Sequence, residues 1–194
     1  MTKNKIKKAA IKEFGEKGYE KATLKSIAAY VGIKAPSIYA FFDNKDDLYI
    51  IAFQEVLDSH LKNVTNMDDK FEKKCAKDQL YSVLQKACDY HLHFESETKL
   101  LNRAMLFPPP SLEKQIHTSF FEEEGFLSQF LINIFKKGME EGSIKEQEID
   151  AMLKAYFCLL DGIYLQLLYY SPPEFKKRID ASWNYFWLGI KNNE

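Results

Sequence analysis

Cysteine is scarce in this sequence, and the three that occur form no recognisable pattern. Cys75, Cys88 and Cys158 are odd in number, and no two of them have the C-x-x-C spacing of redox or zinc motifs. A small secreted domain held together by disulfides would need more cysteines, in an even number. We therefore expect free thiols and a reducing, cytoplasmic environment.

Long apolar segments are missing as well. No stretch of about 18 uninterrupted apolar residues occurs, and the richest one, 155–170, contains Asp161 and Gln166. The basic start M-T-K-N-K-I-K-K is followed by no apolar segment of the kind found in signal peptides. The sequence therefore predicts neither a membrane-spanning helix nor secretion.

Strand signals are also absent, because alternating β-branched residues and closely spaced turn residues do not appear. Apolar residues instead recur at helical spacing along the chain. With 194 residues, 46% hydrophobic and 28% charged, the chain can bury a substantial core and has the composition of an ordinary globular protein. We predict an all-α fold of about nine helices.

Motifs of catalysis or metal binding are equally scarce. The sequence has no glycine-rich phosphate loop and no G-x-S-x-G. His91 and His93 are two apart and hence on different faces of a helix, unlike the i, i+4 pair of metal sites. Cys88 and His91 could meet on one face, but no third catalytic partner is evident. We predict that the protein is not an enzyme and holds no metal or cofactor.

The charge is unevenly distributed along the chain, although the net charge is only -1. Residues 1–50 contain 10 Lys or Arg against 6 Asp or Glu, a net charge of +4. Residues 51–194 contain 17 against 22, a net charge of -5. A basic amino-terminal segment ahead of an acidic remainder indicates that one end of the protein meets a polyanion.

The stretch from residue 23 to residue 45, T-L-K-S-I-A-A-Y-V-G-I-K-A-P-S-I-Y-A-F-F-D-N-K, predicts two very short helices joined by a tight turn. The hydroxyl of Thr23 can accept from a free N–H of the first turn. Gly32 can end this helix in the left-handed conformation, and Pro36 suits the first turn of the next one. The apolar residues that face a common core are Ile27, Ala28, Val31, Ile38 and Phe42. This arrangement is typical of a DNA-binding helix-turn-helix.

Apolar spacing predicts further helices on both sides of this motif. An amphipathic helix covers residues 3–15, and Asn44 can cap a long helix that runs to about residue 65. Ser111 is a candidate N-cap for another long helix, after the helix-breaking F-P-P-P-S. The remaining predicted helices span about 71–94, 99–106, 111–141, 146–170 and 174–191.

A resemblance to the TetR (tetracycline-repressor) family of bacterial transcription regulators is carried by the run F-G-E-K-G-Y-E-K-A-T-L-K-S-I-A-A-Y-V-G-I-K-A-P-S-I-Y-A-F-F-D-N-K-D-D-L. It covers roughly residues 6–55 and includes I-A-x-x-V-G-I, S-I-Y and F-x-x-K at fixed spacing. The later C-L-L-D-G-I-Y-L-Q is similar to a segment on the penultimate helix of many members. The resemblance implies a DNA-binding domain over 1–46, with its motif at about 23–42, and a ligand-binding and dimerisation domain over 47–194.

Five side chains are predicted to contact DNA phosphates: Thr23, Ser37, Tyr39, Phe41 and Lys45. A lysine in the first turn of a helix opposes the helix dipole, unless a phosphate takes up the helix N–H groups and the ammonium together. A solvated lysine is the alternative for Lys45. The resemblance implies that the Tyr39 hydroxyl donates to phosphate, whereas Phe41 offers only van der Waals contact.

Base edges are predicted to be read by Lys34 and Ala35 at the start of the second short helix, with Lys25 from the helix before it. A lysine can donate to guanine O6 and N7, and an alanine can only touch a thymine methyl. Because this set is small, we expect DNA shape to contribute much of the specificity.

The last two predicted helices are unusually apolar, and the first of them carries apolar residues on more than one face. Such a helix needs burial on several sides, which a four-helix interface in a twofold dimer would provide. A thick monomeric core is the alternative. We predict a homodimer through the last two helices.

The sequence indicates only the character of a ligand pocket. Eight residues could line it, although a residue of this kind is more often part of the core: His91, Phe94, Met105, Phe126, Phe130, Phe157, Tyr164 and Trp183. Their mixture suits a mainly apolar or aromatic effector. The resemblance implies binding to a palindromic operator and a ligand cavity. With these, the overall prediction is a repressor that binds a palindromic operator in double-stranded DNA as a homodimer and is released by that effector. A helix-turn-helix regulator that acts through a protein partner, without an effector, is the alternative.

Overall fold

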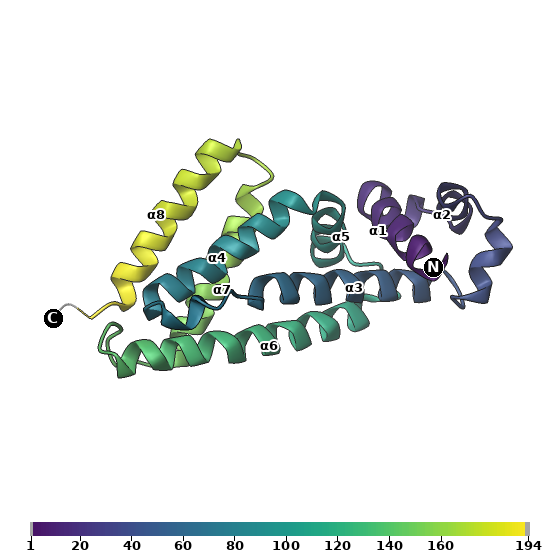
Figure 1. Cartoon of the computed structure of the whole chain (residues 1–194). Coiled ribbons are helices and arrows are strands. Elements are labelled where there is room, and N and C mark those ends of the chain that lie inside the picture. The colour runs from purple at the N-terminus through teal and green to yellow at the C-terminus, as the bar shows by residue number, and fades with distance from the viewer. Residues whose placement is uncertain (1, 193–194) are drawn as a thin grey trace. The chain divides into compact units, whose positions relative to one another are not determined.

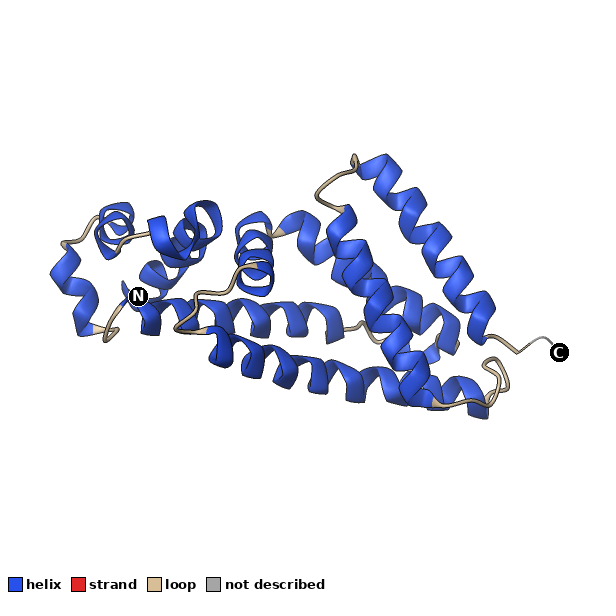
Figure 2. Ribbon diagram, turned by 180° about the vertical axis from the view of Figure 1, so that it is seen from behind, coloured by secondary structure: helices blue, strands red, loops and turns tan. Residues whose placement is uncertain are grey.

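The computed structural model describes residues 2–192 and divides them into two compact units. The first contains the chain up to Leu61 together with residues 93–124, and the second contains residues 62–92 and those from 125 onward. The described residues form eight α-helices and two 3-10 helices but no strand (Figure 1, Figure 2). The predicted all-α fold is confirmed.

The first unit begins with helix α1 (Thr2–Lys21), which is kinked at Gly18 (φ 78°, ψ 166°). Only glycine readily adopts this backbone conformation. The helix thus continues beyond residue 15, where the sequence analysis ended it, and Gly15 is buried within it. Its apolar face buries Ile6, Ala10 and Phe14.

Three elements follow α1 in this unit: helix α2 (Leu24–Val31), the 3-10 helix η1 (Ala35–Ala40) and helix α3 (Lys45–Thr65). The backbone N–H of Asp47 donates to Asn44 Oδ1 at 2.8 Å, so Asn44 caps α3 as predicted. Ile27 and Ala28 of α2, Ile38 of η1 and Phe42 after it are buried, and they hold these short elements together.

Helix α5 (Glu95–Leu106) belongs to the same unit and packs against α1. Arg103 donates from Nε to the carbonyl of Gly15 at 2.8 Å and from Nη2 to that of Glu16 at 3.2 Å. These carbonyls lie next to the kink in α1, where the helix leaves them without regular N–H partners. Arg103 therefore caps the main part of α1 from a segment about 88 residues away in the sequence.

Helix α6 (Glu113–Glu140) starts two residues later than predicted. Residues 109–112 form a turn in which the N–H of Leu112 donates to the carbonyl of Pro109 at 2.9 Å. The prediction that Ser111 is the N-cap is wrong, because its hydroxyl donates to Asp46 Oδ2 at 3.2 Å instead. This bond joins the proline-rich segment to the start of α3 within the first unit.

The second unit contains the 3-10 helix η2 (Phe71–Lys73), most of helix α4 (Ala76–His93), the later part of α6, and helices α7 (Ile149–Gln166) and α8 (Pro172–Ile190). The Tyr156 hydroxyl donates to the carbonyl of Leu80 at 2.7 Å in the interior. Helix α8 begins earlier than predicted, because a proline is tolerated in the first turn of a helix. Helix α7 ends earlier than predicted, in turns at 167–170.

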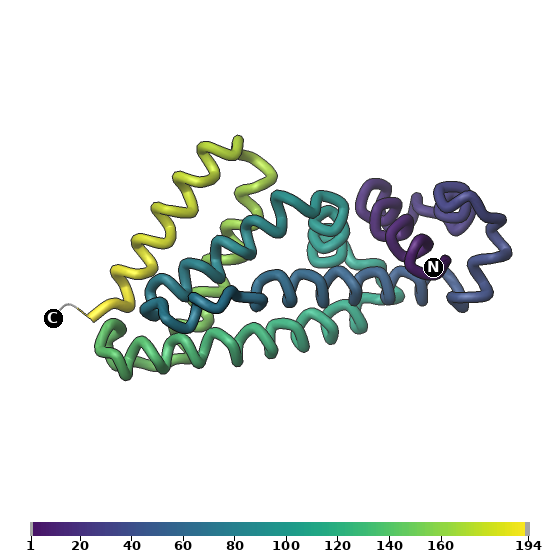
Figure 3. Tube along the Cα trace, in the orientation of Figure 1, coloured from purple at the N-terminus to yellow at the C-terminus, as the bar shows by residue number. Residues whose placement is uncertain are grey.

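The chain passes between the two units three times, each time inside a helix. The boundaries fall at 61/62 in α3, at 92/93 in α4 and at 124/125 in α6. Figure 3 traces each of these three helices as a continuous coil. Neither unit is therefore one uninterrupted segment of sequence.

Candidate DNA interface

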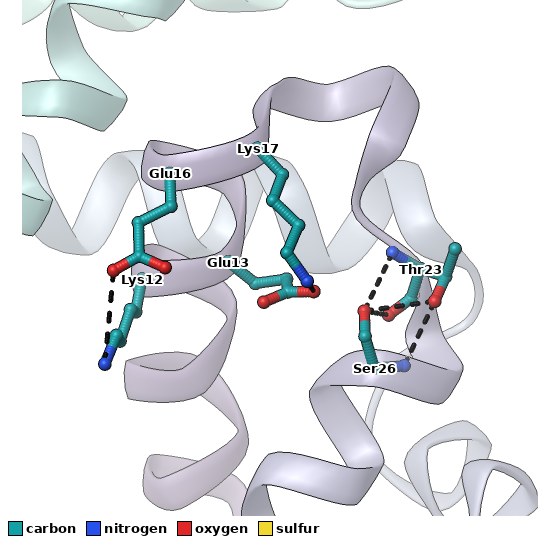
Figure 4. A network of polar contacts seen from close by, with 6 residues as sticks. All are labelled: Lys12, Glu13, Glu16, Lys17, Thr23 and Ser26. Carbon is teal, nitrogen blue, oxygen red and sulfur yellow. Dashed lines mark hydrogen bonds and ion pairs between the residues drawn. The ribbon is translucent and has the colours of Figure 1, made fainter.

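Thr23 and Ser26 form a reciprocal capping box at the start of α2 (Figure 4). The N–H of Ser26 donates to Thr23 Oγ1 at 3.0 Å, and the N–H of Thr23 donates to Ser26 Oγ at 3.2 Å. Both hydroxyls remain close to an exposed surface. The predicted cap is confirmed, and it gives a helix of only eight residues a defined start.

The turn between α2 and η1 depends on Gly32, whose backbone is left-handed (φ 77°, ψ 29°). Its N–H donates to the carbonyls of Ala28 and Ala29, and the N–H of Ile33 donates to Ala28 at 3.0 Å. A residue with a Cβ would be strained in this conformation. The turn thus ends α2 and sets the direction of η1.

The second helix of the motif is a 3-10 helix rather than an α-helix, with Pro36 in its first turn as predicted. Ile38 is buried beneath it, whereas Tyr39 is 60% exposed and Phe41, just after it, is 39% exposed. Ser37 is also exposed. The short element thus presents an aromatic and hydroxylic surface to the outside.

The predicted base readers lie on both helices of the motif. Lys25 on α2 and Lys34 before η1 are exposed, and Ala35 is half-buried. The side chain of Lys34 makes no capping hydrogen bond to η1. Both ammonium groups are therefore positioned on the surface without being needed to hold the fold.

Lys45, the first residue of α3, has a contact that the sequence analysis missed. Its Nζ lies 4.1 Å from the centroid of the Tyr19 ring, a cation–π distance. The Tyr19 hydroxyl in turn donates to Asp46 Oδ1. Burial, with Asp46 as the next cause, raises the pKa of Tyr19 to about 12, so the phenol is neutral at neutral pH. Lys45 is held over this ring and is half-buried, not simply solvated.

A second aromatic contact was also missed, because it joins two different helices. Lys12 Nζ of α1 lies 5.1 Å from the ring centroid of Tyr30, which is on α2 and largely exposed. Lys12 also lies 4.0 Å from Glu16, while Lys17 pairs with Glu13 at 2.6 Å (Figure 4). Exposed Tyr30 extends the polar and aromatic surface beyond the predicted residues.

This geometry agrees with the comparison with known proteins. Residues 6–50 match the family described as bacterial regulatory proteins, tetR family. The amino-terminal part of this chain, with the helix-turn-helix, therefore matches the tetR family. Its relatives include the fatty acid metabolism regulator protein of Bacillus subtilis, which is 28% identical over 143 residues, 71% of this chain and 68% of that protein.

Solved structures of transcription regulators share the fold. The transcriptional regulator FadR from Bacillus subtilis, solved in complex with stearoyl-CoA, superimposes with a TM-score of 0.73 at 22% identity, covering 96% of this chain and 98% of that one. A TetR transcription regulator from Haloarcula marismortui gives a TM-score of 0.80 at 14% identity, covering 98% of both chains. The tetR fold therefore extends over the whole described chain.

The predicted pocket residues are spread over both compact units. Phe94 and Met105 belong to the first unit, and the other six to the second. The rings of His91 and Tyr164 lie 4.1 Å apart, which brings α4 and α7 together. Trp183 packs in a separate cluster against Tyr81, with 5.4 Å between ring centroids. The other members lie elsewhere in the second unit: Phe126 is exposed, Phe130 stacks on Phe71, and Phe157 is half-buried.

A smaller cleft of about 210 Å³ lies between α4 and α8 in the second unit, and the sequence analysis did not identify its lining. Tyr81 borders it and donates to Asp180 Oδ1 at 2.5 Å. Cys88 also borders it, and burial raises the pKa of this thiol to about 12. A protonated thiol is a poor nucleophile. No group of three or more potential metal ligands occurs within residues 2–192.

The relatives named above are all regulators of transcription or metabolism. Across the described part of the chain, none of the helices has the length and apolar character needed to cross a membrane.

Proposed function

We propose that this chain is a repressor that binds a palindromic operator as a homodimer and is released from it by a mainly apolar effector. The observation that carries the proposal is the capped helix-turn-helix, whose Lys25, Lys34, Ser37 and Tyr39 are all exposed. Such a surface suits phosphate contacts that position the protein and base contacts that specify the sequence.

The proposed phosphate contacts are made by Thr23, Ser37, Tyr39, Phe41 and Lys45, and the proposed base contacts by Lys25, Lys34 and Ala35. Lys45 stands at the amino end of α3, where helix N–H groups attract an anion. Its contact with the Tyr19 ring restricts the ammonium to this end of the helix. The cation–π contact therefore supports a directed phosphate contact.

Dimerisation through α7 and α8 is supported by the outward residues of α7. Ala151, Ala155, Cys158, Gly162 and Leu165 are all exposed and alternate at spacings of four and three, the pattern of a helix–helix seam. Ala181, Tyr185 and Leu188 continue it on α8. Small residues on α7 permit close approach of a second copy.

For the effector we propose a long-chain acyl compound. Two relatives support this class: one is a fatty acid metabolism regulator protein, and the other was solved in complex with stearoyl-CoA. The lining that we propose consists of the predicted residues that belong to the second unit: His91, Phe126, Phe130, Phe157, Tyr164 and Trp183. Of these, His91 and Tyr164 are in ring contact. Phe157 lies on α7, as Tyr164 does, and is half-buried.

Replacing Lys45 with alanine should weaken binding to all DNA sequences alike. The loss of one phosphate contact per protomer lowers the slope of log affinity against log salt by about 0.9 for each protomer bound. Lys34→Ala, the matched lysine variant, should instead relax the preference at one position of each half-site. Salt titrations and selection on random DNA measure the two effects. Equal salt slopes for Lys45→Ala and the parent would remove Lys45 from the phosphate contacts.

Stearoyl-CoA should release the protein from an operator obtained by that selection. An effector lowers the affinity for DNA when it binds the conformation that cannot bind DNA more tightly than the one that can. The size of the effect is set by the difference between these two effector affinities. It should also raise the Tm of the free protein by mass action. Mobility shifts and thermal unfolding check this, with free coenzyme A as the control. An unchanged operator affinity and an unchanged Tm would reject the acyl effector and leave DNA binding in place.

A regulator that acts through a protein partner is the second candidate function. The acidic remainder of the chain favours it, with Glu122, Glu123 and Glu124 on α6. Glu123 is already paired with His60 at 2.6 Å, so this run is partly used by the fold. The effector-controlled repressor is therefore the better supported proposal.

A further inference from the structure

A cleft inside the first unit is lined by none of the residues assigned to DNA or to the effector. It has a volume of about 530 Å³ and is bounded by the end of α1, by α5 and by the proline-rich segment 107–110. Volumes of this size accommodate small organic ligands. Its walls include the kink at Gly18 and the residues that lead towards α2.

One wall of the cleft contains a polar group that the fold leaves unused. Tyr49 of α3 is only 2% exposed, and its ring packs against Phe14 and Tyr19 at centroid distances of 4.9 and 5.3 Å. Within residues 2–192 its hydroxyl makes no hydrogen bond, and the residue lines the cleft. The hydroxyl is not among the fully buried atoms that lack a partner, so it is open to the cleft. A ligand acceptor at this point could therefore take its hydrogen bond in place of water.

The cleft lining also contains a cation that is not neutralised by a carboxylate. Lys17 is paired with Glu13 at 2.6 Å, whereas Arg103 forms no ion pair within residues 2–192. Arg103 uses Nε and Nη2 to hold α1, and within the described chain Nη1 has no hydrogen-bond partner. Burial raises the pKa of Tyr49 to about 12, although the positive charge of Arg103 acts to lower it. The phenol is therefore neutral at neutral pH and can donate a hydrogen bond. A carboxylate matches these two donors.

The remaining walls are aromatic or otherwise apolar. Phe107 is 81% exposed at the cleft, and Pro108, Pro109 and Pro110 follow it. A large exposed ring that no neighbour covers can close over a flat ligand. We propose that this cleft binds a small aromatic carboxylate, with its acid group at Tyr49 and Arg103 and its ring against Phe107 and the prolines.

The proposal concerns a site distinct from that of the acyl effector, and it does not depend on the function proposed above. None of the residues proposed for the effector borders this cleft. A ligand here would instead touch the end of α1 and the connection to α2. Binding can therefore be measured on the full chain without DNA.

The test uses 2-naphthoate as the probe and isothermal titration calorimetry as the readout. Tyr49→Phe keeps the packed ring and should weaken binding by about fivefold to tenfold, the effect of one lost hydrogen bond. Phe107→Ala, at an exposed position, should weaken it by a similar factor. The neutral analogue 2-naphthalenemethanol should bind at least about tenfold more weakly than the acid, because charge-assisted hydrogen bonds are stronger.

Matched controls are Tyr81→Phe, which removes a hydroxyl at the other cleft, and Phe121→Ala, which removes an exposed ring on α6. Both should bind 2-naphthoate as the parent does. No binding at millimolar probe would overturn the proposal. Unchanged affinity in both Tyr49→Phe and Phe107→Ala would also overturn it, since the probe would then occupy a different site.

Discussion

Replacing Leu165 with glutamate is expected to produce a monomer whose operator affinity is about 10²- to 10⁴-fold lower than that of the parent. Leu165 is 43% exposed on α7, so the charge does not disturb the interior of the chain. In the proposed dimer it would be buried without a partner, which is costly. Each monomer would then lose the gain in affinity that comes from binding two half-sites at once.

Light scattering after gel filtration measures the mass, and mobility shifts measure the operator affinity. Leu106→Glu introduces the same charge at an exposed leucine of α5 and should change neither. Gly162→Leu tests the same interface with a bulky side chain. Within one chain nothing lies within 4 Å of a Cβ added at this position, so the leucine should interfere only with a second copy. A Leu165→Glu protein that stays dimeric would exclude α7 from the interface.

Gly15→Ala is expected to lower the Tm by about 3–8 °C. The added Cβ would lie 2.6 Å from the backbone oxygen of Ser96, so α1 or α5 must shift. Overpacking of this kind costs about 1–3 kcal/mol, which outweighs the gain of up to about 1 kcal/mol from replacing a helical glycine. In a chain of this length each kcal/mol corresponds to about 2–4 °C.

Gly125→Ala is the matched control, because Gly125 is exposed within α6 and nothing lies within 4 Å of its added Cβ. This variant should gain about 0.5–1 kcal/mol and unfold at a higher temperature. Thermal unfolding followed by circular dichroism distinguishes the two. A Gly15→Ala protein as stable as the parent would mean that α5 is free to move away from α1.

The local features of the motif could be predicted from the sequence because each depends on neighbouring residues. Thr23 and Asn44 cap their helices through side chains that reach only three residues ahead, and Gly32 ends a helix through its own backbone. The spacing of apolar residues similarly predicted that Ile27, Ala28, Ile38 and Phe42 are buried, whereas Val31 is only half-buried. These parts of the fold are encoded over a few residues at a time.

Contacts between distant segments could not be predicted in this way. The bonds from Arg103 to α1 and from Ser111 to Asp46 join residues 88 and 65 positions apart, respectively. Without knowledge of the packing, Ser111 before a helix could only be interpreted as a cap. The pocket prediction has the same weakness, since aromatic residues at helical spacing do not reveal which of them meet across helices.

The passage of the chain between the two units within three helices has a consequence for engineering hybrid regulators. A graft that carries only residues 1–46 would leave behind Arg103, whose side chain caps α1, and Ser111, which binds Asp46. The transplanted residues 1–46 would be less stable, because both of these contacts would be missing from the hybrid protein. A functional chimaera should therefore carry the α5 segment and the proline-rich turn together with the motif, as two separate pieces of the sequence that form a single exchangeable part.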